Sequence, residues 1–285
     1  MMAQVHQITT APGLTFDVLI DGPSEGAPVL LLHGFAESFH HWDAQIAAVA
    51  NAGYRAIAPS QRGYSPAARP DPANTDSYVF DRLVDDPMQI AGKLGLTRFH
   101  LVGHDWGGSI AWGIADKYPE RLASLTILSR PHPNAFNRAL ALPDGEQKQR
   151  SRHHRAFLEP GAAAVVLAND AEWLRVRWDA ACVPKAAQEK HLAVLGNPAA
   201  MEAALAWYRA RGAIRSPLGV IRVPTLYIWG DADDTVGRPA AEWTREWVSG
   251  PYEFAVLPGG GHFTADQMPE QVNALMLAHL KRNPI

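Results

Sequence analysis

The chain has 285 residues, a net charge of −3 at pH 7 and 47% hydrophobic residues. This composition is ample for a large buried core, and the lack of a basic excess argues against a nucleic-acid partner and against attraction to a membrane surface. Cys182 is the only cysteine, which excludes an internal disulfide and fits a reducing, cytoplasmic location. We expect neither a signal peptide in residues 1–10 nor a membrane span, because no apolar stretch is long enough.

In chain order, short apolar segments alternate with longer helical patterns. Segments 5–9 and 14–19 predict an antiparallel entry to a sheet, and continuous apolar runs typical of buried strands follow at 28–33, 54–58, 99–102, 122–128, 224–229 and 254–257. Helical patterns occupy 43–51, 78–94, 106–118, 239–248 and 269–281. This alternation predicts βαβ units, and therefore an α/β fold with a mostly parallel central sheet flanked by helices.

The alternation stops between residues 131 and 218. Helical periodicity covers 161–170, 171–181, 184–195 and 198–211, with no convincing strand. We expect this segment to be a helical lid inserted between two strands. The predicted organisation is a core in two parts, 1–130 and 219–285, with the lid at 131–218.

The most informative motif is GHDWGG at residues 103–108, which follows a predicted strand and opens a predicted helix. This is the context of a nucleophile elbow, whose glycines permit a tight turn and close backbone approach. The elbow raises the carboxylate of Asp105 beside the helix N-terminus. A carboxylate can displace a leaving group from a saturated carbon and form an alkyl ester, whereas its attack on an ordinary ester would give a labile anhydride. Asp105 therefore favours epoxides or alkyl halides as substrates, the alternative being that it only caps the helix.

A base and an acid follow in the chain order expected for such an elbow. His262 lies in a glycine-rich loop after the last predicted strand and is the candidate general base for water. Three acids follow the strand that ends at Gly230, and any of them can orient the imidazole. Asp233 is the preferred candidate, Asp234 the second and Asp231 the third.

An early strand ends in the sequence HGFAE at residues 33–37. The main-chain N–H groups of Phe35 and Trp106 are expected to form an oxyanion hole for the carbonyl oxygen of Asp105 when water attacks the ester. His33 is expected to stabilise the loop rather than take part in the chemistry.

Together, HGFAE at 33–37, RGYS at 62–65, GHDWGG at 103–108, GDAD at 230–233 and GH at 261–262 resemble the α/β-hydrolase superfamily over nearly the whole chain. The Asp-Trp pair in the elbow resembles the epoxide hydrolase and haloalkane dehalogenase branch specifically. The resemblance implies an epoxide hydrolase that needs no metal or organic cofactor.

In that branch, two lid tyrosines assist the departing epoxide oxygen. Tyr208 matches the acid tyrosine, but the residues before the FLEPG stretch at 157–161 contain no second tyrosine. His153 or His154 is the hypothetical replacement. Two smaller departures are Ala36, where the family usually has proline, and Ser60, where it commonly has an acid.

The main alternative is a haloalkane dehalogenase. The indole N–H of Trp106 is suited to bind a halide, and a second tryptophan from the lid would complete the site, the candidates being Trp173, Trp178 and Trp207. Phe35 occupies the place where such enzymes usually carry asparagine. A haloacid is disfavoured, because Trp106 and Ser109 provide no positive charge beside the nucleophile.

A further alternative from another class is a non-catalytic protein that binds a small ligand on the same fold. The aromatic residues expected around the site, Phe35 and Trp106 together with the lid tryptophans, indicate a small apolar or aromatic substrate. A monomer or a small homo-oligomer is compatible with the sequence.

Overall fold

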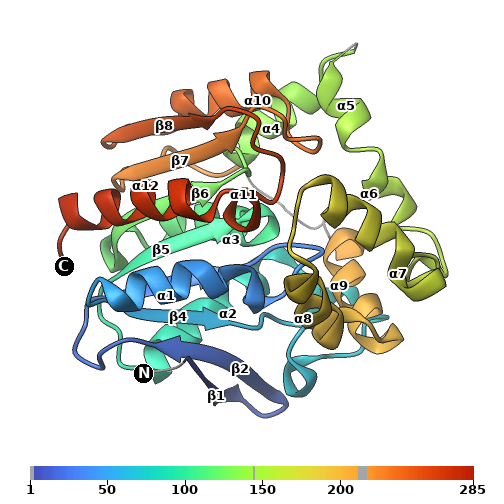
Figure 1. Cartoon of the computed structure of the whole chain (residues 1–285), viewed down its shortest axis with the longest axis horizontal. Helices are drawn as coiled ribbons and strands as arrows, with labels where there is room; N and C mark the ends of the chain where they lie inside the picture. The colour runs from blue at the N-terminus through green and yellow to red at the C-terminus, as the bar shows by residue number, and fades with distance from the viewer. Residues whose placement is uncertain (1–2, 144, 211–216) are drawn as a thin grey trace.

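The computed structural model describes residues 3–143, 145–210 and 217–285. A single sheet has the strand order β1-β2-β4-β3-β5-β6-β7-β8 (Figure 1). Its strands are β1 (Gln4–Ala11), β2 (Leu14–Asp21), β3 (Pro28–Leu32), β4 (Arg55–Pro59), β5 (Phe99–His104), β6 (Leu122–Leu128), β7 (Thr225–Gly230) and β8 (Tyr252–Leu257).

The pairing of the strands confirms the predicted α/β sheet. β2 runs antiparallel to both β1 and β4, and every other neighbouring pair in the sheet is parallel. Every residue of β5, β6 and β7 is buried, as their continuous apolar sequences predict for strands covered on both faces. The first two segments form the predicted antiparallel entry.

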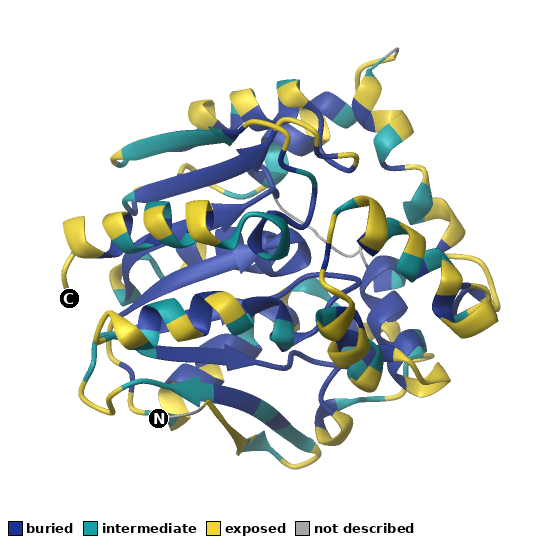
Figure 2. Ribbon diagram, viewed as in Figure 1, coloured by how far each residue is buried: buried dark blue, intermediate teal, exposed yellow. Residues whose placement is uncertain are grey.

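Helices cover both faces of the sheet. Successive residues of a strand point to opposite faces, so their side chains pack into two separate apolar cores. In β3, Leu30 belongs to the core that packs on α2 and α3, whereas Leu31 belongs to the core that packs on α1 and α12. Figure 2 shows the result, with buried strands in the middle and exposed residues on the outer sides of the helices. The helices of this part of the chain are α1 (Asp43–Asn51), α2 (Phe80–Lys93), α3 (Asp105–Lys117), α10 (Arg238–Trp243), α11 (Thr264–Gln267) and α12 (Pro269–Arg282).

In the part of the chain that the structure describes, the segment between β6 and β7 consists of helices joined by loops, with no strand beyond an isolated bridge at Ile221. Its helices are α4 (Pro133–Leu140), α5 (Glu146–Arg150), α6 (His153–Ala156), α7 (Ala162–Ala180), α8 (Lys185–Leu195) and α9 (Pro198–Arg209). Non-helical backbone at 168–171 divides α7 at the predicted break between 170 and 171. Arg211, the predicted end of the last of these helices, lies outside the described residues.

Figure 1 shows α6 to α9 gathered at one end of the sheet. We propose that residues 131–218 form a lid domain and that 1–130 and 219–285 form the core. Within the described part of the chain, no helix combines the length and the apolar character needed to cross a bilayer.

Candidate active site

Asp105 stands at the sharp turn between β5 and α3. Its φ is 47°, in the left-handed region that non-glycine residues rarely adopt. The turn brings α3 so close to β3 that a Cβ on Gly107 would lie 2.0 Å from the main-chain oxygen of Leu32. The strained aspartate and the close helix–strand contact are the two structural properties expected of a nucleophile elbow.

The carboxylate of Asp105 is held by the loop that follows β3. The main-chain N–H of Phe35 donates a hydrogen bond to Asp105 Oδ1 at 3.0 Å. Only glycine fits at position 34, since a Cβ there would lie 2.4 Å from Asp105 Cβ. The N-cap residue of α3 is His104, so helix capping does not account for the position of Asp105. Trp106 is the next residue of α3 and is also buried.

His262 lies between two carboxylates. Its Nε2 is 3.8 Å from Asp105 Oδ2, and its Nδ1 is 3.3 Å from Asp233 Oδ2. Asp233 is fully buried, and its Oδ1 accepts hydrogen bonds from the main-chain N–H groups of Thr235 and Val236 at 2.8 and 3.0 Å. The imidazole is thus oriented by a fixed acid on one side and faces the candidate nucleophile on the other.

The two other acids that follow β7 are exposed and serve different contacts. Asp231 accepts a hydrogen bond from the N–H of Gly259, and Asp234 forms an ion pair with Arg177 at 3.2 Å. The structure therefore brings Asp233 to His262, whereas Asp231 and Asp234 lie at the surface.

Ser129 is a site residue that the sequence reasoning missed. Its hydroxyl donates to Asp233 Oδ2 at 2.6 Å and lies 3.0 Å from His262 Nδ1. A signal for it was present, because Ser129 directly follows β6 and the carboxyl ends of parallel strands meet at one edge of a sheet. Ser129 supplies the acid with a hydrogen bond from a third strand end.

The charges around His262 favour its protonated form. Burial alone would lower the pKa of His262, but the neighbouring Asp233 and Asp105 outweigh it and raise the pKa to about 9. Burial would likewise raise the pKa of Asp233, but His262 and Ser129 hold it below its usual value. Esterification of Asp105 would remove one of the charges that stabilise the imidazolium, so it would lower the pKa of His262.

A pocket between the core and the helical segment opens onto Asp105 and His262. Its empty space is about 360 Å³, including a part open to solvent. The other residues that line it are mostly aromatic or apolar, namely Phe35, Ala36, His153, Phe157, Trp173, Leu174, Arg177, Trp178, Tyr208, Thr235 and Phe263.

Tyr208 extends from α9 into this pocket and is packed by aromatic rings. The centres of the Phe157, Trp106 and Phe35 rings lie 4.9, 5.2 and 5.5 Å from the centre of the Tyr208 ring. These edge-to-face contacts fix the phenol in a direction set by the core as well as by the lid. His154 packs on the same ring at 5.3 Å.

The two candidate replacements for a second tyrosine occupy different places. His153 lines the pocket together with Tyr208, whereas His154 is absent from the described residues that line it. Burial, reinforced by the charge of Arg177, lowers the pKa of His153 to about 4, so this imidazole is neutral near pH 7. A neutral imidazole can donate one N–H to a ligand.

The lid tryptophans also divide into two groups. Trp173 and Trp178 line the pocket. Trp207 instead donates its indole N–H to the main-chain oxygen of Arg62 at 3.0 Å and packs against Trp106. Trp207 therefore secures α9 on the core, and its indole hydrogen is already used.

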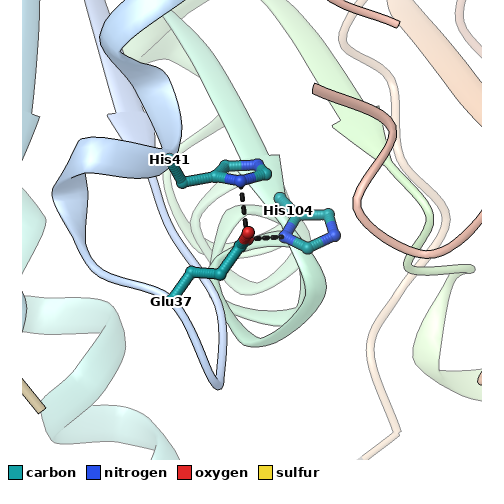
Figure 3. A group of neighbouring side chains, drawn as sticks. All are labelled: Glu37, His41 and His104. Carbon is teal, nitrogen blue, oxygen red and sulfur yellow. Dashed lines mark ion pairs between the residues drawn. The ribbon is translucent and has the colours of Figure 1, made fainter. Parts of the chain in front are cut away.

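A group of ionisable side chains lies next to Asp105 and His262 but does not line the pocket. Three of these side chains are drawn in Figure 3. Glu37, His41 and His104 each offer a possible metal ligand within 4.8 Å of the others, as do Glu37, His191 and Asp266. However, His41 Nδ1 lies only 2.6 Å from Glu37 Oε2. Two ligands about 2.0–2.2 Å from a tetrahedral zinc ion stand well over 3 Å apart. The contact between these two atoms is therefore that of an ion pair and not that of two ligands of one zinc ion.

The sheet order, the elbow and the Asp–His pair beside it define an α/β hydrolase. Residues 27–269 match the family model described as alpha/beta hydrolase fold. The chain belongs to this family and is an epoxide hydrolase-like hydrolase within it, as its relatives show.

Two curated relatives resemble the chain over most of its length. It is 31% identical to AB hydrolase superfamily protein YfhM of Bacillus subtilis over 282 residues, which cover 96% of this chain and 97% of that protein. It is also 31% identical to epoxide hydrolase 4 of Mus musculus over 280 residues, covering 94% of this chain and 77% of the relative.

Solved structures of epoxide hydrolases also resemble this chain over nearly its whole length. An epoxide hydrolase found in metagenomes from hot environments superposes with a TM-score of 0.86 at 30% identity, covering 98% of this chain and 99% of that one. An inhibitor complex of the epoxide hydrolase of Bacillus megaterium superposes with a TM-score of 0.87 at 25% identity, covering 97% and 100%.

Proposed function

We propose that the chain is an epoxide hydrolase that forms an alkyl ester on Asp105 and hydrolyses it with water activated by His262. The observation that carries the proposal is the environment of one carboxylate. Asp105 Oδ1 is bound by the N–H of Phe35, and Oδ2 faces His262 in a pocket that also contains Tyr208. A carboxylate so placed can attack a saturated carbon and afterwards be released by water.

In the first step, an oxygen of Asp105 forms a bond to one carbon of the epoxide while that carbon's bond to the ring oxygen breaks. The departing oxygen is strongly basic and takes a proton from the phenol of Tyr208. We assign to the neutral imidazole of His153 the second hydrogen bond that this oxygen receives. His153 lines the pocket, whereas His154 contacts the ring of Tyr208 without lining the pocket.

In the second step, neutral His262 accepts a proton from water, which attacks the carbonyl carbon of the Asp105 ester. The oxygen that becomes negative is stabilised by the main-chain N–H groups of Phe35 and Trp106. The bond between that carbon and the ester oxygen, which Asp105 had supplied, then breaks, and this oxygen takes the proton from His262 and leaves as the second hydroxyl of a diol. The oxygen of the water stays on Asp105, and the proton of the new carboxyl group restores the phenol of Tyr208. Asp233 stabilises the imidazolium formed on His262. The aromatic pocket favours a small apolar or aromatic epoxide.

Replacing Tyr208 with Phe tests the epoxide assignment against a haloalkane. We expect turnover of an aryl epoxide to fall about 10²- to 10⁴-fold, because the alkoxide loses its proton donor. Displacement of bromide from a bromoalkane should change little, since halide is a weak base that leaves without a proton. The measurement is diol and bromide formation by the purified variant and the wild type. Wild-type protein that releases bromide but forms no diol would favour the dehalogenase.

A matched pair of substitutions tests whether Asp233 is the acid that orients His262. Asp233→Asn should lower turnover by about 10⁴-fold, as loss of the acid does in another hydrolase triad. Asp234→Asn, one residue away, should retain most activity because its carboxylate is exposed and pairs with Arg177 instead of His262. The measurement is the steady-state rate of each variant and of the wild type with one epoxide. Equal losses in the two variants would contradict the assignment of Asp233 as the acid.

A further inference from the structure

The ion cluster beside Asp105 and His262 consists of the buried Glu37, His41 and His104 and the partly buried Asp266, which come from three segments of the chain. Glu37 follows β3, His41 lies in the short helix η1 (Phe39–Trp42), His104 ends β5 and Asp266 belongs to α11. Figure 3 shows the carboxylate of Glu37 directed at the rings of His41 and His104. The proposed reaction assigns no step to any of these side chains, so their burial calls for another explanation.

One imidazole faces two carboxylates in this cluster. His41 Nδ1 lies 2.6 Å from Glu37 Oε2 and 2.9 Å from Asp266 Oδ2, and the ring of His41 is fully buried. Burial would lower the pKa of His41, but Glu37 and Asp266 outweigh it and raise the pKa to about 10. Burial raises the pKa of Glu37 to about 8, whereas His41 holds the pKa of Asp266 below its usual value despite burial, so Asp266 is the negative partner of His41. His41 is therefore a buried cation, and breaking such a pair by removing one partner leaves an uncompensated charge.

His104 connects this cation to the candidate base. The ring of His104 stacks on that of His41, with centres 4.5 Å apart, and its Nε2 lies 2.9 Å from the main-chain oxygen of His262. Because a carbonyl oxygen only accepts hydrogen bonds, Nε2 carries the hydrogen. Burial keeps the pKa of His104 well below its usual value, so the ring is neutral and its Nδ1 lone pair faces Glu37 Oε2 at 3.8 Å.

The cluster binds the segment that carries His262 at two points. His104 holds the main-chain oxygen of His262 itself, and His41 holds Asp266, four residues further along the chain. The helical segment adds a third element, since His191 of α8 accepts hydrogen bonds from Ser38 and places its Nε2 3.7 Å from Glu37 Oε1. Glu37 belongs to the loop that carries Phe35, so the cluster reaches that loop through Glu37 and the segment of His262 through His104 and Asp266.

We propose that His41 and Asp266 are positioning residues for His262: their buried ion pair, together with the hydrogen bond from His104, fixes the segment that carries the base at its working distance from Asp105. This inference rests on the proposed role of His262 as the base for ester hydrolysis. The pair is expected to act more on the second chemical step than on the first, because His41 binds the segment of the base through Asp266 but reaches the loop of Phe35 only through Glu37.

The test compares Asp266→Asn and His41→Gln with His40→Gln. His40 is the matched control, because it adjoins His41 but is partly exposed and pairs with Asp43. Quenched-flow reactions with an aryl epoxide, followed by intact-protein mass, give the rates of ester formation and ester hydrolysis separately. We expect hydrolysis to slow about 10- to 100-fold in the two test variants, as a small misplacement of a catalytic group can. Ester formation should stay within about threefold of the wild type, so the ester accumulates.

Equal slowing of both steps, or of neither, would overturn the proposal. A second readout keeps the test independent of activity. In NMR titrations of the imidazole of His262, its pKa should fall in Asp266→Asn as the ring moves away from its carboxylates, and stay unchanged in His40→Gln. If the wild type forms no ester with any epoxide, the proposed function fails, and the titration alone still decides whether the cluster positions His262. Asp266→Asn retains the size of the side chain, and thermal unfolding of each variant shows whether the measurements are made on folded protein.

Discussion

Asp105→Asn is expected to abolish turnover of epoxides, with a loss of at least about 10⁵-fold. Removal of the nucleophile from another hydrolase triad costs about 10⁶-fold, and an amide cannot form the alkyl ester on which the proposed reaction depends. The substitution is nearly isosteric, and its remaining oxygen can still accept the hydrogen bond from the N–H of Phe35. The fold of the elbow should therefore survive.

The measurement is diol formation by the purified variant, together with the intact mass of the protein after incubation with substrate. Wild-type protein quenched during turnover should carry a mass increase equal to that of the epoxide, and the variant should carry none. A circular dichroism spectrum and an unfolding temperature close to those of the wild type show that the loss is chemical. Substantial diol formation by the variant would rule out Asp105 as the nucleophile.

Much of the site was predictable because it depends on the ends of strands. A buried run of apolar residues that stops at glycine predicts a parallel strand, and the residues after it must lie at the carboxyl edge of the sheet. The segments around Phe35, Asp105 and Asp233 all satisfy this rule, and the structure gathers them around His262. The sequence also favoured Asp233 over its two neighbours, although it left all three open.

What could not be predicted depends on packing between segments far apart in the chain. Nothing local to Trp207 reveals that its indole hydrogen bonds to Arg62, and nothing local to His153 and His154 reveals which of them enters the pocket. These outcomes are set by how the helical segment lies on the core. Ser129 was missed for a different reason. Its position after β6 places it at the carboxyl edge of the sheet, but a single serine there does not by itself distinguish a site residue from a loop residue.

The buried ion cluster also lay beyond the sequence. Glu37 and His41 are four residues apart, but their partners His104 and Asp266 lie on two other segments of the fold. Apolar periodicity identifies buried faces only from their apolar residues. It therefore does not reveal charged residues that are buried because they are paired. Only the structure shows that these four side chains lie together and that they contact the segment that carries His262.

His262→Gln is expected to stop the proposed reaction after its first step. Glutamine cannot take a proton from water, so the ester on Asp105 should form and then persist, with hydrolysis slowed by about 10⁵-fold or more. Intact-protein mass after incubation with an aryl epoxide should show a stable adduct, and peptide mapping should place it on Asp105. A bromoalkane supplied in place of the epoxide would give an alkyl adduct of its own if halides are the true substrates. Absence of an adduct with either electrophile would favour a non-catalytic binding protein.

The pH dependence of the same step carries an independent test in the wild type. Water activation requires neutral His262, so the rate of ester hydrolysis rises with pH until it passes the pKa of this imidazole. In the free enzyme Asp233 and Asp105 raise that pKa to about 9 despite burial. Esterification removes the charge of Asp105 while that of Asp233 remains, so the midpoint for hydrolysis should lie below the pKa of His262 in the free enzyme. Single-turnover rates across pH give the first value, and an NMR titration of His262 without substrate gives the second. A hydrolysis midpoint at or above the free-enzyme value would mean that the charge lost on alkylation is not next to the base, and that the nucleophile is a group other than Asp105.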